Sequence, residues 1–385
     1  MINNFTYYNP VKVIFGKETI ALIAKNIPTD AKVMITYGGG SIFKNGVYDQ
    51  VKVALTSFEV VEFGGIEPNP TYETLMKAVE LGRIEKIDFI LSVGGGSVLD
   101  GTKFISAAIP FSEGNEWENI VKAKRIKAAI PLGAVLTLPA TGSEMNSGAV
   151  ISKAETKEKF AMSSPLLFPK FSVLDPETTF SLPKKQIANG AADAFTHVME
   201  QYMTYPIGAM IQDQFAESVL RTLISVGPKA LENQTDYDTM SNLMWAATVA
   251  LNGWISLGVP SDWATHQIGH ELTALHGVDH ARTLAVVLPH LMRYKKENKR
   301  GKLIQYAKNV WNETGTDDDL VEKAITNTIN FYESLGIPTK GSVYGINLDT
   351  IKEIKTRFTE RGVVYGENKD ITPEAVEDIL NMSIA

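Results

Sequence analysis

The first half of the chain alternates short β-branched runs with amphipathic segments, and this alternation constrains the fold more than any other feature. Six apolar runs predict strands, at residues 11–15, 32–37, 59–63, 88–93, 133–138 and 171–174. Helical segments such as residues 71–84 lie between them, so the pattern indicates a doubly wound, largely parallel sheet. After Pro183 the alternation stops, and amphipathic segments predict helices, for example at 210–224, 240–256 and 317–336. We therefore predict an α/β domain over residues 1–183 and an all-α domain over residues 184–385.

Composition and charge narrow the class of protein. The chain has 385 residues, 44% of them apolar and 21% charged, which is the composition of a folded protein large enough for two cores. A net charge of −7 argues against a nucleic-acid partner, because no basic face can be assumed. The chain has no cysteine, so any bound metal must use oxygen and nitrogen ligands. No signal segment precedes the first strand and no run reaches about 18 apolar residues, so we expect a cytoplasmic protein without membrane contact.

Two glycine-rich loops follow predicted strands. One strand runs into Gly94, Gly95, Gly96 and Ser97 and then into a helical segment, and the strand at 32–37 runs into the loop 38–41, Gly-Gly-Gly-Ser. Glycine lets the backbone approach an anion, and the first amides of a helix supply donors to it. A tight turn between strand and helix explains one such loop equally well. Two loops at the carboxyl ends of parallel strands favour an extended dinucleotide.

The loops also bear on the type of dinucleotide. Neither carries the G-x-G-x-x-G fingerprint with an acid about 20 residues further on, so the binding mode differs from the usual one. Residues 36–41 contain no acid to bind ribose hydroxyls, and their small side chains leave room for a 2′-phosphate, which predicts NADPH rather than NADH. A third loop places the hydroxyls of Thr137, Thr141 and Ser143 after another strand, although a polar turn is the alternative explanation.

Histidines cluster in the second half of the chain. All six follow residue 196, and four lie within residues 263–280. His266 and His270 share one face of a predicted helix, and Gly277 permits a break before His280. The next histidine after His270 is His276, so the spacing is H-E-x-x-x-x-H and not the H-E-x-x-H of zinc proteases.

An aspartate joins this cluster from an upstream helix. Asp193 and His197 are four residues apart, a spacing that places both on one helical face, where they can converge on one ion. An aspartate with imidazoles suits Fe(II) or Zn(II). For any one of these residues, an ordinary core or surface position is the alternative.

Four motifs together resemble the iron-containing alcohol dehydrogenases: GGGSVLD at 94–100, LPATGSE at 138–144, NGAADAFTH at 189–197 and HQIGHELTALHGVDHARTLAVVLP at 266–289. Further segments, FGKETI, YGGGS, GGIEPNP and VPSDWATH, are similar to the branch of NADPH-dependent aldehyde reductases and butanol dehydrogenases. The resemblance implies a dinucleotide-binding α/β domain, a helical metal-binding domain as in dehydroquinate synthase relatives, and a homodimer. It implies hydride transfer between NADPH and small aldehydes or primary alcohols.

The same resemblance implies roles for particular residues. The ligands of Fe(II) or Zn(II) would be Asp193, His197, His266 and His280. His270 would orient substrate or water and relay a proton, and Asp100 would lie by the nicotinamide. The residues that would contact the cofactor are Gly95, Gly96 and Ser97 at the pyrophosphate, Thr137 and Thr141, Gly38, Gly39 and Ser41 at the adenosine ribose, and Lys159 at a 2′-phosphate.

Two other functions share this pattern. A carbon–oxygen lyase on the same fold would need basic residues for an anionic substrate, and the histidine-rich segment offers only Arg282. A non-catalytic sensor of NADPH or metal would be favoured by the loss of a ligand, but all four ligand positions are occupied.

Overall fold

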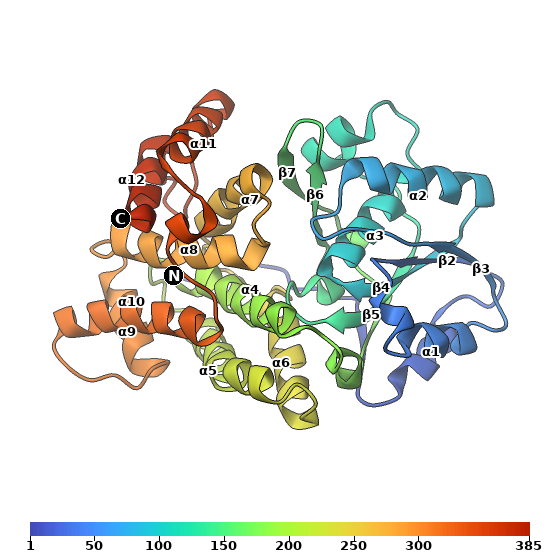
Figure 1. Ribbon diagram of the computed structural model, residues 1–385, viewed down its shortest axis with the longest axis horizontal. Coiled ribbons are helices and arrows are strands. Elements are labelled where there is room, and N and C mark those ends of the chain that lie inside the picture. Colours follow the sequence, from blue (N-terminus) through green and yellow to red (C-terminus); the bar gives the residue numbers. More distant parts are fainter. The chain divides into compact units, whose positions relative to one another are not determined.

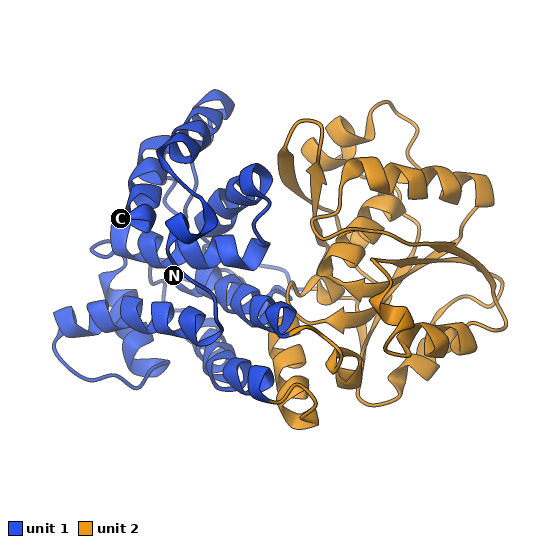
Figure 2. Cartoon of the chain, viewed as in Figure 1, with its two compact units in different colours: residues 1–7, 184–232, 249–385 blue, residues 8–183, 233–248 orange.

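The computed structural model describes residues 1–385 and divides into two compact units (Figure 2). Unit 1 comprises residues 1–7, 184–232 and 249–385, and unit 2 comprises residues 8–183 and 233–248. The chain passes from one unit to the other at Pro183, and neither unit is continuous in sequence. Residues 1–7 precede the α/β part of the sequence but belong to unit 1. Residues 233–248 lie within the helical part of the sequence but belong to unit 2.

Unit 2 is built on a six-stranded parallel sheet in the order β1-β8-β5-β4-β2-β3 (Figure 1). Its strands are β1 (Lys12–Phe15), β2 (Lys32–Tyr37), β3 (Glu59–Phe63), β4 (Phe89–Gly95), β5 (Leu132–Leu138) and β8 (Phe171–Leu174). All six predicted strands are confirmed to within two residues at either end. The central strands are buried on both faces, which is why β4 and β5 read as continuous apolar runs.

Helices cover both faces of this sheet, so the predicted doubly wound architecture is confirmed. Along β4, Ile90 points into a core formed with α2 (Tyr72–Glu85) and α3 (Gly96–Ala108). Its neighbour Leu91 points into a second core formed with α1 (Val47–Ala54) and the short 3₁₀ helix at residues 19–26. The alternation of side chains along a strand therefore separates two apolar layers.

An antiparallel hairpin lies beside the parallel sheet and was not predicted. It consists of β6 (Gly148–Lys153) and β7 (Glu158–Ser163), and β6 packs against α3. The polar residues at 152–158 and the short strand lengths hide this element from a search for apolar runs.

Unit 1 is helical, as predicted. Apart from α6 (Tyr237–Ala250), which lies mainly in unit 2, the helices are α4 (Lys184–Tyr202), α5 (Met210–Glu232), α7 (Ala264–His276), α8 (His280–Tyr294), α9 (Arg300–Asn309), α10 (Asp317–Ser334), α11 (Leu348–Arg361) and α12 (Pro373–Ile384). The helix predicted at 240–256 is too long: α6 (Tyr237–Ala250) ends at Ala250. Asn252 then accepts from the Trp254 amide (3.0 Å), and Gly253 adopts a left-handed φ of 92°, so the helix cannot continue. None of the helices has the length and apolar content that a membrane crossing requires.

Candidate metal centre and cofactor loops

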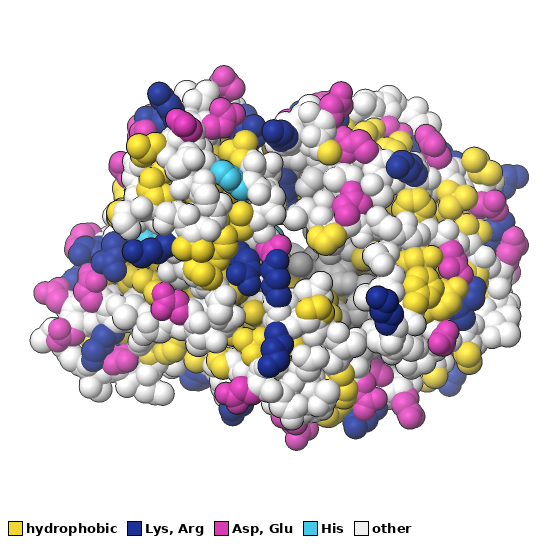
Figure 3. Space-filling model, in the orientation of Figure 1, with side chains coloured by type: hydrophobic (Ala, Val, Ile, Leu, Met, Phe, Trp, Pro, Cys, Tyr) yellow, Lys and Arg dark blue, Asp and Glu magenta, His cyan; other side chains and the backbone are white.

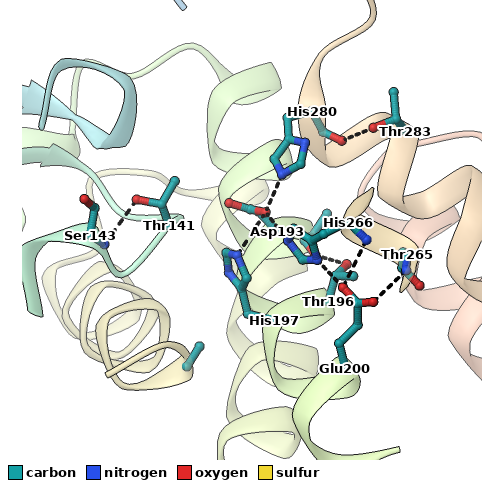
Figure 4. Close-up of polar contacts among 12 residues, drawn as sticks. Thr141, Ser143, Asp193, Thr196, His197, Glu200, Thr265, His266, His280 and Thr283 are labelled. Carbon is teal, nitrogen blue, oxygen red and sulfur yellow. Dashed lines mark hydrogen bonds and ion pairs between the residues drawn. The ribbon is translucent and has the colours of Figure 1, made fainter. Parts of the chain in front are cut away.

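Four of the predicted site residues meet around one carboxylate oxygen in unit 1. Asp193 Oδ1 lies 3.8 Å from the Nε2 atoms of His197, His266 and His280 (Figure 4). Asp193 and His197 are on α4, His266 is on α7, and His280 begins α8. Ligand atoms around a four-coordinate zinc ion lie roughly 3.4 Å apart when the bonds are about 2.1 Å long. The observed separations are close to that value, and Asp193, His266 and His280 each bring one potential ligand atom within 4.8 Å of the others, a spacing that could hold a metal ion.

Local structure explains why these side chains converge. Asp193 and His197 lie one helical turn apart on a helix that is buried throughout residues 190–202. Gly277 ends α7 with a left-handed φ of 65°, which lets the chain turn and present His280 at the start of the next helix. Asp279, just before it, accepts from Asn189 Nδ2 of α4 (2.9 Å). The start of α8 is thereby tied to α4, the helix that carries Asp193 and His197.

The electrostatics of this cluster suit a divalent cation. Burial lowers the pKa of His197 to about 4, so its imidazole is neutral and able to act as a ligand. Burial would also lower the pKa of His266, but the charges of Glu200 and Asp193 outweigh it and raise that pKa to about 9. A site that favours a positive charge on an imidazole also favours a metal cation. His266 Nε2 is buried without a hydrogen-bond partner, so the donor set fits Fe(II) or Zn(II).

Of the three remaining histidines, one lies next to the cluster around Asp193 and two lie away from it. His270 is buried, and its ring centroid lies 5.1 Å from that of His280 and 6.3 Å from that of His266. His276 instead contacts Thr350 Oγ1 through Nε2 (2.9 Å), and His290 Nδ1 contacts the Val286 carbonyl (2.7 Å). Both of these contacts lie outside the cluster.

The predicted cofactor loops lie together in unit 2, at the carboxyl ends of β2, β4 and β5, which are neighbours in the sheet. The strand order reverses direction between β2 and β4, and such a switch point is where parallel α/β sheets bind ligands. Gly95 precedes the first turn of α3 without a side-chain cap, so the amides of that turn are available to an anion.

The glycines in these loops have different reasons to be glycine. A Cβ on Gly96 would lie 2.4 Å from Thr141 Oγ1, and one on Gly38 would lie 3.1 Å from the Ile66 carbonyl oxygen. Packing alone therefore demands a small residue at these two positions. A Cβ on Gly39 would meet nothing within 4 Å, so this glycine leaves open space at the tip of β2.

Polar side chains around the second glycine loop form a connected set. Lys159 Nζ donates to Asn69 Oδ1 (2.8 Å), and the Asn69 amide donates to Ser97 Oγ (3.3 Å). These contacts link the Lys159 ammonium to the loop at 94–97, where a pyrophosphate is expected. Thr137 is buried at the end of β5, and Thr141 Oγ1 accepts from the Ser143 amide (3.2 Å).

Asp100 is held inside this unit by two donors. Ser143 Oγ donates to its Oδ1 (2.7 Å), and the Val150 amide donates to its Oδ2 (2.9 Å). Fully buried Lys103 completes the arrangement, with Nζ 2.7–3.2 Å from five oxygens of Ser143, Asn146 and Gly148. Burial lowers the pKa of Lys103 to about 8, against the opposing charges of Asp100 and Glu144. Asp100 and Lys103 thus position the loop that carries Thr141, a role the sequence did not indicate.

Two family models match the chain. "Iron-containing alcohol dehydrogenase" matches residues 10–176, and "Fe-containing alcohol dehydrogenase family, C-terminal" matches residues 187–384. The chain belongs to the iron-containing alcohol dehydrogenase family. The resemblance deduced from the sequence motifs is confirmed.

Known members of the iron-containing alcohol dehydrogenase family are similar over the whole length. The NADPH-dependent aldehyde reductase YqhD of Escherichia coli is 56% identical over 375 residues, which cover 96% of this chain and 97% of that protein. Its crystal structure matches with a TM-score of 0.97 over 99% of both chains. A probable NADH-dependent butanol dehydrogenase of Bacillus subtilis is 40% identical over 100% of both chains. The structure of NADH-dependent butanol dehydrogenase A from Thermotoga maritima matches with a TM-score of 0.95 at 36% identity, over 100% of this chain and 99% of that one.

Sequence reasoning missed two side chains at the candidate metal centre of this iron-containing alcohol dehydrogenase. Glu200 contacts His266 Nδ1, and Trp263 packs with its ring centroid 5.4 Å from that of His266. Glu200 could have been found, because it follows Asp193 by seven residues, about two helical turns, and so lies on the same helical face. Two other tryptophans, Trp245 and Trp254, pack elsewhere, against Phe15 and Tyr7.

Proposed function

We propose that this protein is a metal-dependent oxidoreductase that transfers hydride between NADPH and small aldehydes, with primary alcohols as the products and as the substrates of the reverse reaction. The observation that carries the proposal is the convergence of three imidazoles on Asp193 Oδ1 in a family named for its iron and its alcohol dehydrogenases. The name of the 56% identical E. coli relative, an NADPH-dependent aldehyde reductase, supports the same reaction.

In this proposal Asp193, His197, His266 and His280 hold one divalent cation. When bound, such a cation polarises a carbonyl and stabilises the alkoxide formed from it. The carboxylate supplies negative charge against the cation, and burial keeps His197 neutral and ready to bind it. His270, whose ring lies next to those of His266 and His280, orients the substrate or a water and moves a proton at a ring nitrogen.

Unit 2 supplies the residues for the cofactor. We propose that the amides at Gly95, Gly96 and Ser97 bind the pyrophosphate, with Lys159 as a nearby positive charge. Thr137 and Thr141 approach the cofactor from the end of β5. The nicotinamide provides the hydride. Asp100 acts by holding Ser143, since both of its oxygens have donors within the protein.

The preference for NADPH rests on the tip of β2. Gly38, Gly39 and Ser41 carry no acid, and the space at Gly39 is open. The nearby carboxylate of Glu62 on β3 accepts from the Tyr37 hydroxyl through Oε2. Its Oε1 accepts from Tyr48 (2.8 Å) and Lys52 (2.9 Å), so this oxygen is already occupied by donors of the protein. Some similar proteins are named for NADPH and others for NADH. We therefore propose a preference for NADPH and not its exclusive use.

The decisive experiment follows NADPH consumption with butanal after the protein has been stripped of metal and reloaded with Fe(II) or Zn(II). Metal-dependent loss of NADPH absorbance is the expected result, and it would identify a working ion. If no ion supports turnover of any short aldehyde, the oxidoreductase proposal fails and a lyase or a sensor becomes the better explanation.

A homodimer remains a prediction from the family resemblance, and a cytoplasmic location remains a prediction from the sequence. The dimer has a direct test, because the chain mass is 42.2 kDa and light scattering after gel filtration should give about twice that value. Apolar side chains that remain exposed in unit 1, among them Met210 and Ile211, are compatible with an association surface. Apolar groups are also visible on the face drawn in Figure 3.

A further inference from the structure

Glu200 is a buried residue whose carboxylate accepts hydrogen bonds from the first turn of α7. It lies on α4 with 2% of its surface exposed. Its Oε1 accepts from the Thr265 amide (2.7 Å), and its Oε2 accepts from the His266 amide (3.2 Å) and also contacts His266 Nδ1 (Figure 4). A buried carboxylate needs several donors to be stable, and here every donor belongs to the first turn of α7.

The backbone amides in the first turn of α7 need hydrogen-bond acceptors from outside the helix. Trp263, which precedes the helix, has a left-handed φ of 62° and gives no side-chain cap. Asp262 Oδ1 accepts from the Ala264 amide (3.0 Å), and Glu200 accepts from the next two amides. The positive end of the helix stabilises the negative charge of the glutamate. Glu200 therefore fixes the end of α7 against α4, the helix that also carries Asp193 and His197.

The contact with the ring has a chemical consequence. A carboxylate only accepts hydrogen bonds, so His266 Nδ1 must carry a proton and donate it. In the neutral ring this leaves Nε2 with its lone pair. That Nε2 atom is the one that faces Asp193 Oδ1 at 3.8 Å and has no hydrogen-bond partner. Metal-binding histidines commonly have their other nitrogen bound in this way, which fixes the tautomer and increases ligand basicity.

We propose that Glu200 is a positioning residue of the metal centre: it holds His266 in the tautomer and orientation that direct Nε2 toward a cation. The inference rests on the proposed function, because it assigns Glu200 a role only if His266 binds metal. It differs from a purely structural role as a helix cap, which would affect folding and leave metal affinity unchanged.

The test is the affinity for Zn(II) in Glu200→Gln, measured by competition with a chromophoric chelator in the absence of cofactor and substrate. The glutamine oxygen can still accept from a backbone amide, but its amide nitrogen cannot accept from Nδ1–H. Zn(II) affinity should fall by about 10- to 100-fold. Glu217→Gln is the matched control, because Glu217 is a buried glutamate of unit 1 that accepts from Tyr202, Gln305 and Asn309 (2.7–2.9 Å) and contacts no predicted ligand.

A second measurement reads the ring directly. In Zn(II)-loaded wild type, ¹⁵N-histidine NMR should show His266 protonated at Nδ1, with the signal assigned by its loss in His266→Ala. In Glu200→Gln this Nδ1–H signal should shift and exchange faster with water. Circular dichroism and zinc-free thermal unfolding establish that each variant is folded.

The outcomes distinguish a failure of the positioning role of Glu200 from a failure of the proposed function. If Glu200→Gln and Glu217→Gln both bind Zn(II) within twofold of wild type, or both lose equally, the positioning role is wrong. If Glu200→Gln does not fold, Glu200→Asp decides: weaker binding by threefold or more supports the role, and unchanged binding overturns it. Wild type that binds no Zn(II) or Fe(II) contradicts the proposed function itself.

Discussion

His266 and His276 lie on the same helix but have different partners. His266 faces the carboxylates of Asp193 and Glu200, whereas His276, ten residues later, contacts the hydroxyl of Thr350. A histidine's neighbours decide whether it binds metal or packs a helix. The two residues therefore form a natural pair of variants within one helix.

We predict that His266→Ala loses bound metal and activity, because one of the four donors is removed and the buried carboxylates of Asp193 and Glu200 each lose an imidazole partner. His276→Ala should keep both, since it removes one hydrogen bond at the other end of α7. Metal content by elemental analysis and NADPH-dependent reduction of butanal check the pair. Full metal content in His266→Ala would show that the proposed ligand set is wrong.

The open space at Gly39 allows a charge to be tested without a steric change in the fold. Gly39→Asp should place an acid where a 2′-phosphate is expected, so the ratio of kcat/KM for NADPH to that for NADH should fall at least tenfold, about 1.4 kcal/mol. Gly39→Asn is the control, because it has nearly the same shape without the charge. A similar fall in both variants would mean that bulk and not charge is responsible.

At the scale of elements, α7 is held at several points along its length. Glu200 and Asp262 bind its first turn, and Glu271 in its middle pairs with Arg357 and Arg361 of α11 (3.3 Å for the Arg357 Nη1 contact). Asp262 is in turn bound by buried Lys299 (2.7 Å). The helix that presents His266 is thus anchored through charged groups at its start and in its middle, and those charges make its stability depend on pH.

The group most sensitive to pH in this arrangement is Glu367, which shares Lys299 with Asp262 (3.0 Å from Lys299 Nζ to Glu367 Oε1). Burial, and then the hydrogen bond to Asp262, raise the pKa of Glu367 to about 7. The folded protein therefore holds this proton above the pH at which an unfolded glutamate releases it. The contribution of Glu367 to stability is present at acidic pH and is lost as pH rises from about 4.5 to about 7.

Glu367→Gln mimics the protonated form, so the variant should gain stability relative to wild type as pH rises from about 5 to about 8. The gain should be on the order of 1–3 kcal/mol in the free energy of unfolding, measured by urea denaturation at each pH. Glu113→Gln, at an exposed pair with Lys127, is the control and should show no such trend. A difference between Glu367→Gln and wild type that does not change with pH contradicts the assignment.

At the scale of the whole molecule, the two kinds of ligand belong to different units. All proposed metal ligands lie in unit 1, on α4, α7 and α8, and all proposed cofactor contacts lie in unit 2, at the ends of β2, β4 and β5 and on β7. Each unit has its own buried apolar clusters. Binding of either ligand should therefore stabilise mainly its own unit.

Hydrogen exchange followed by mass spectrometry can check this division. Zn(II) should slow exchange in the peptides of α4, α7 and α8, and NADPH should slow it in the loops after β2, β4 and β5. A ligand at 100 times its Kd stabilises the state that binds it by about 2.7 kcal/mol, which is large enough to detect. Protection by Zn(II) confined to unit 2 would contradict the metal centre proposed here.

The sequence by itself determined the parallel sheet, most of the helices, the glycine loops and a short set of candidate ligands. Strand and helix periodicity is local, so apolar runs and the spacing of Asp193 and His197 carry this information within a few residues. The end of the helix at Gly277 and the change of pattern at Pro183 are also local features of the sequence. Recognition of the family came from four such motifs read together.

Only the tertiary structure decided which candidates meet. Spacing could not place His280 and His266 around Asp193 while sending His276 to Thr350, because that depends on how α4, α7 and α8 pack. The same holds for Glu200, which contacts a residue 66 positions away, and for the hairpin β6–β7. Long-range partners are set by the burial of whole elements, whereas sequence patterns report the environment of each element alone.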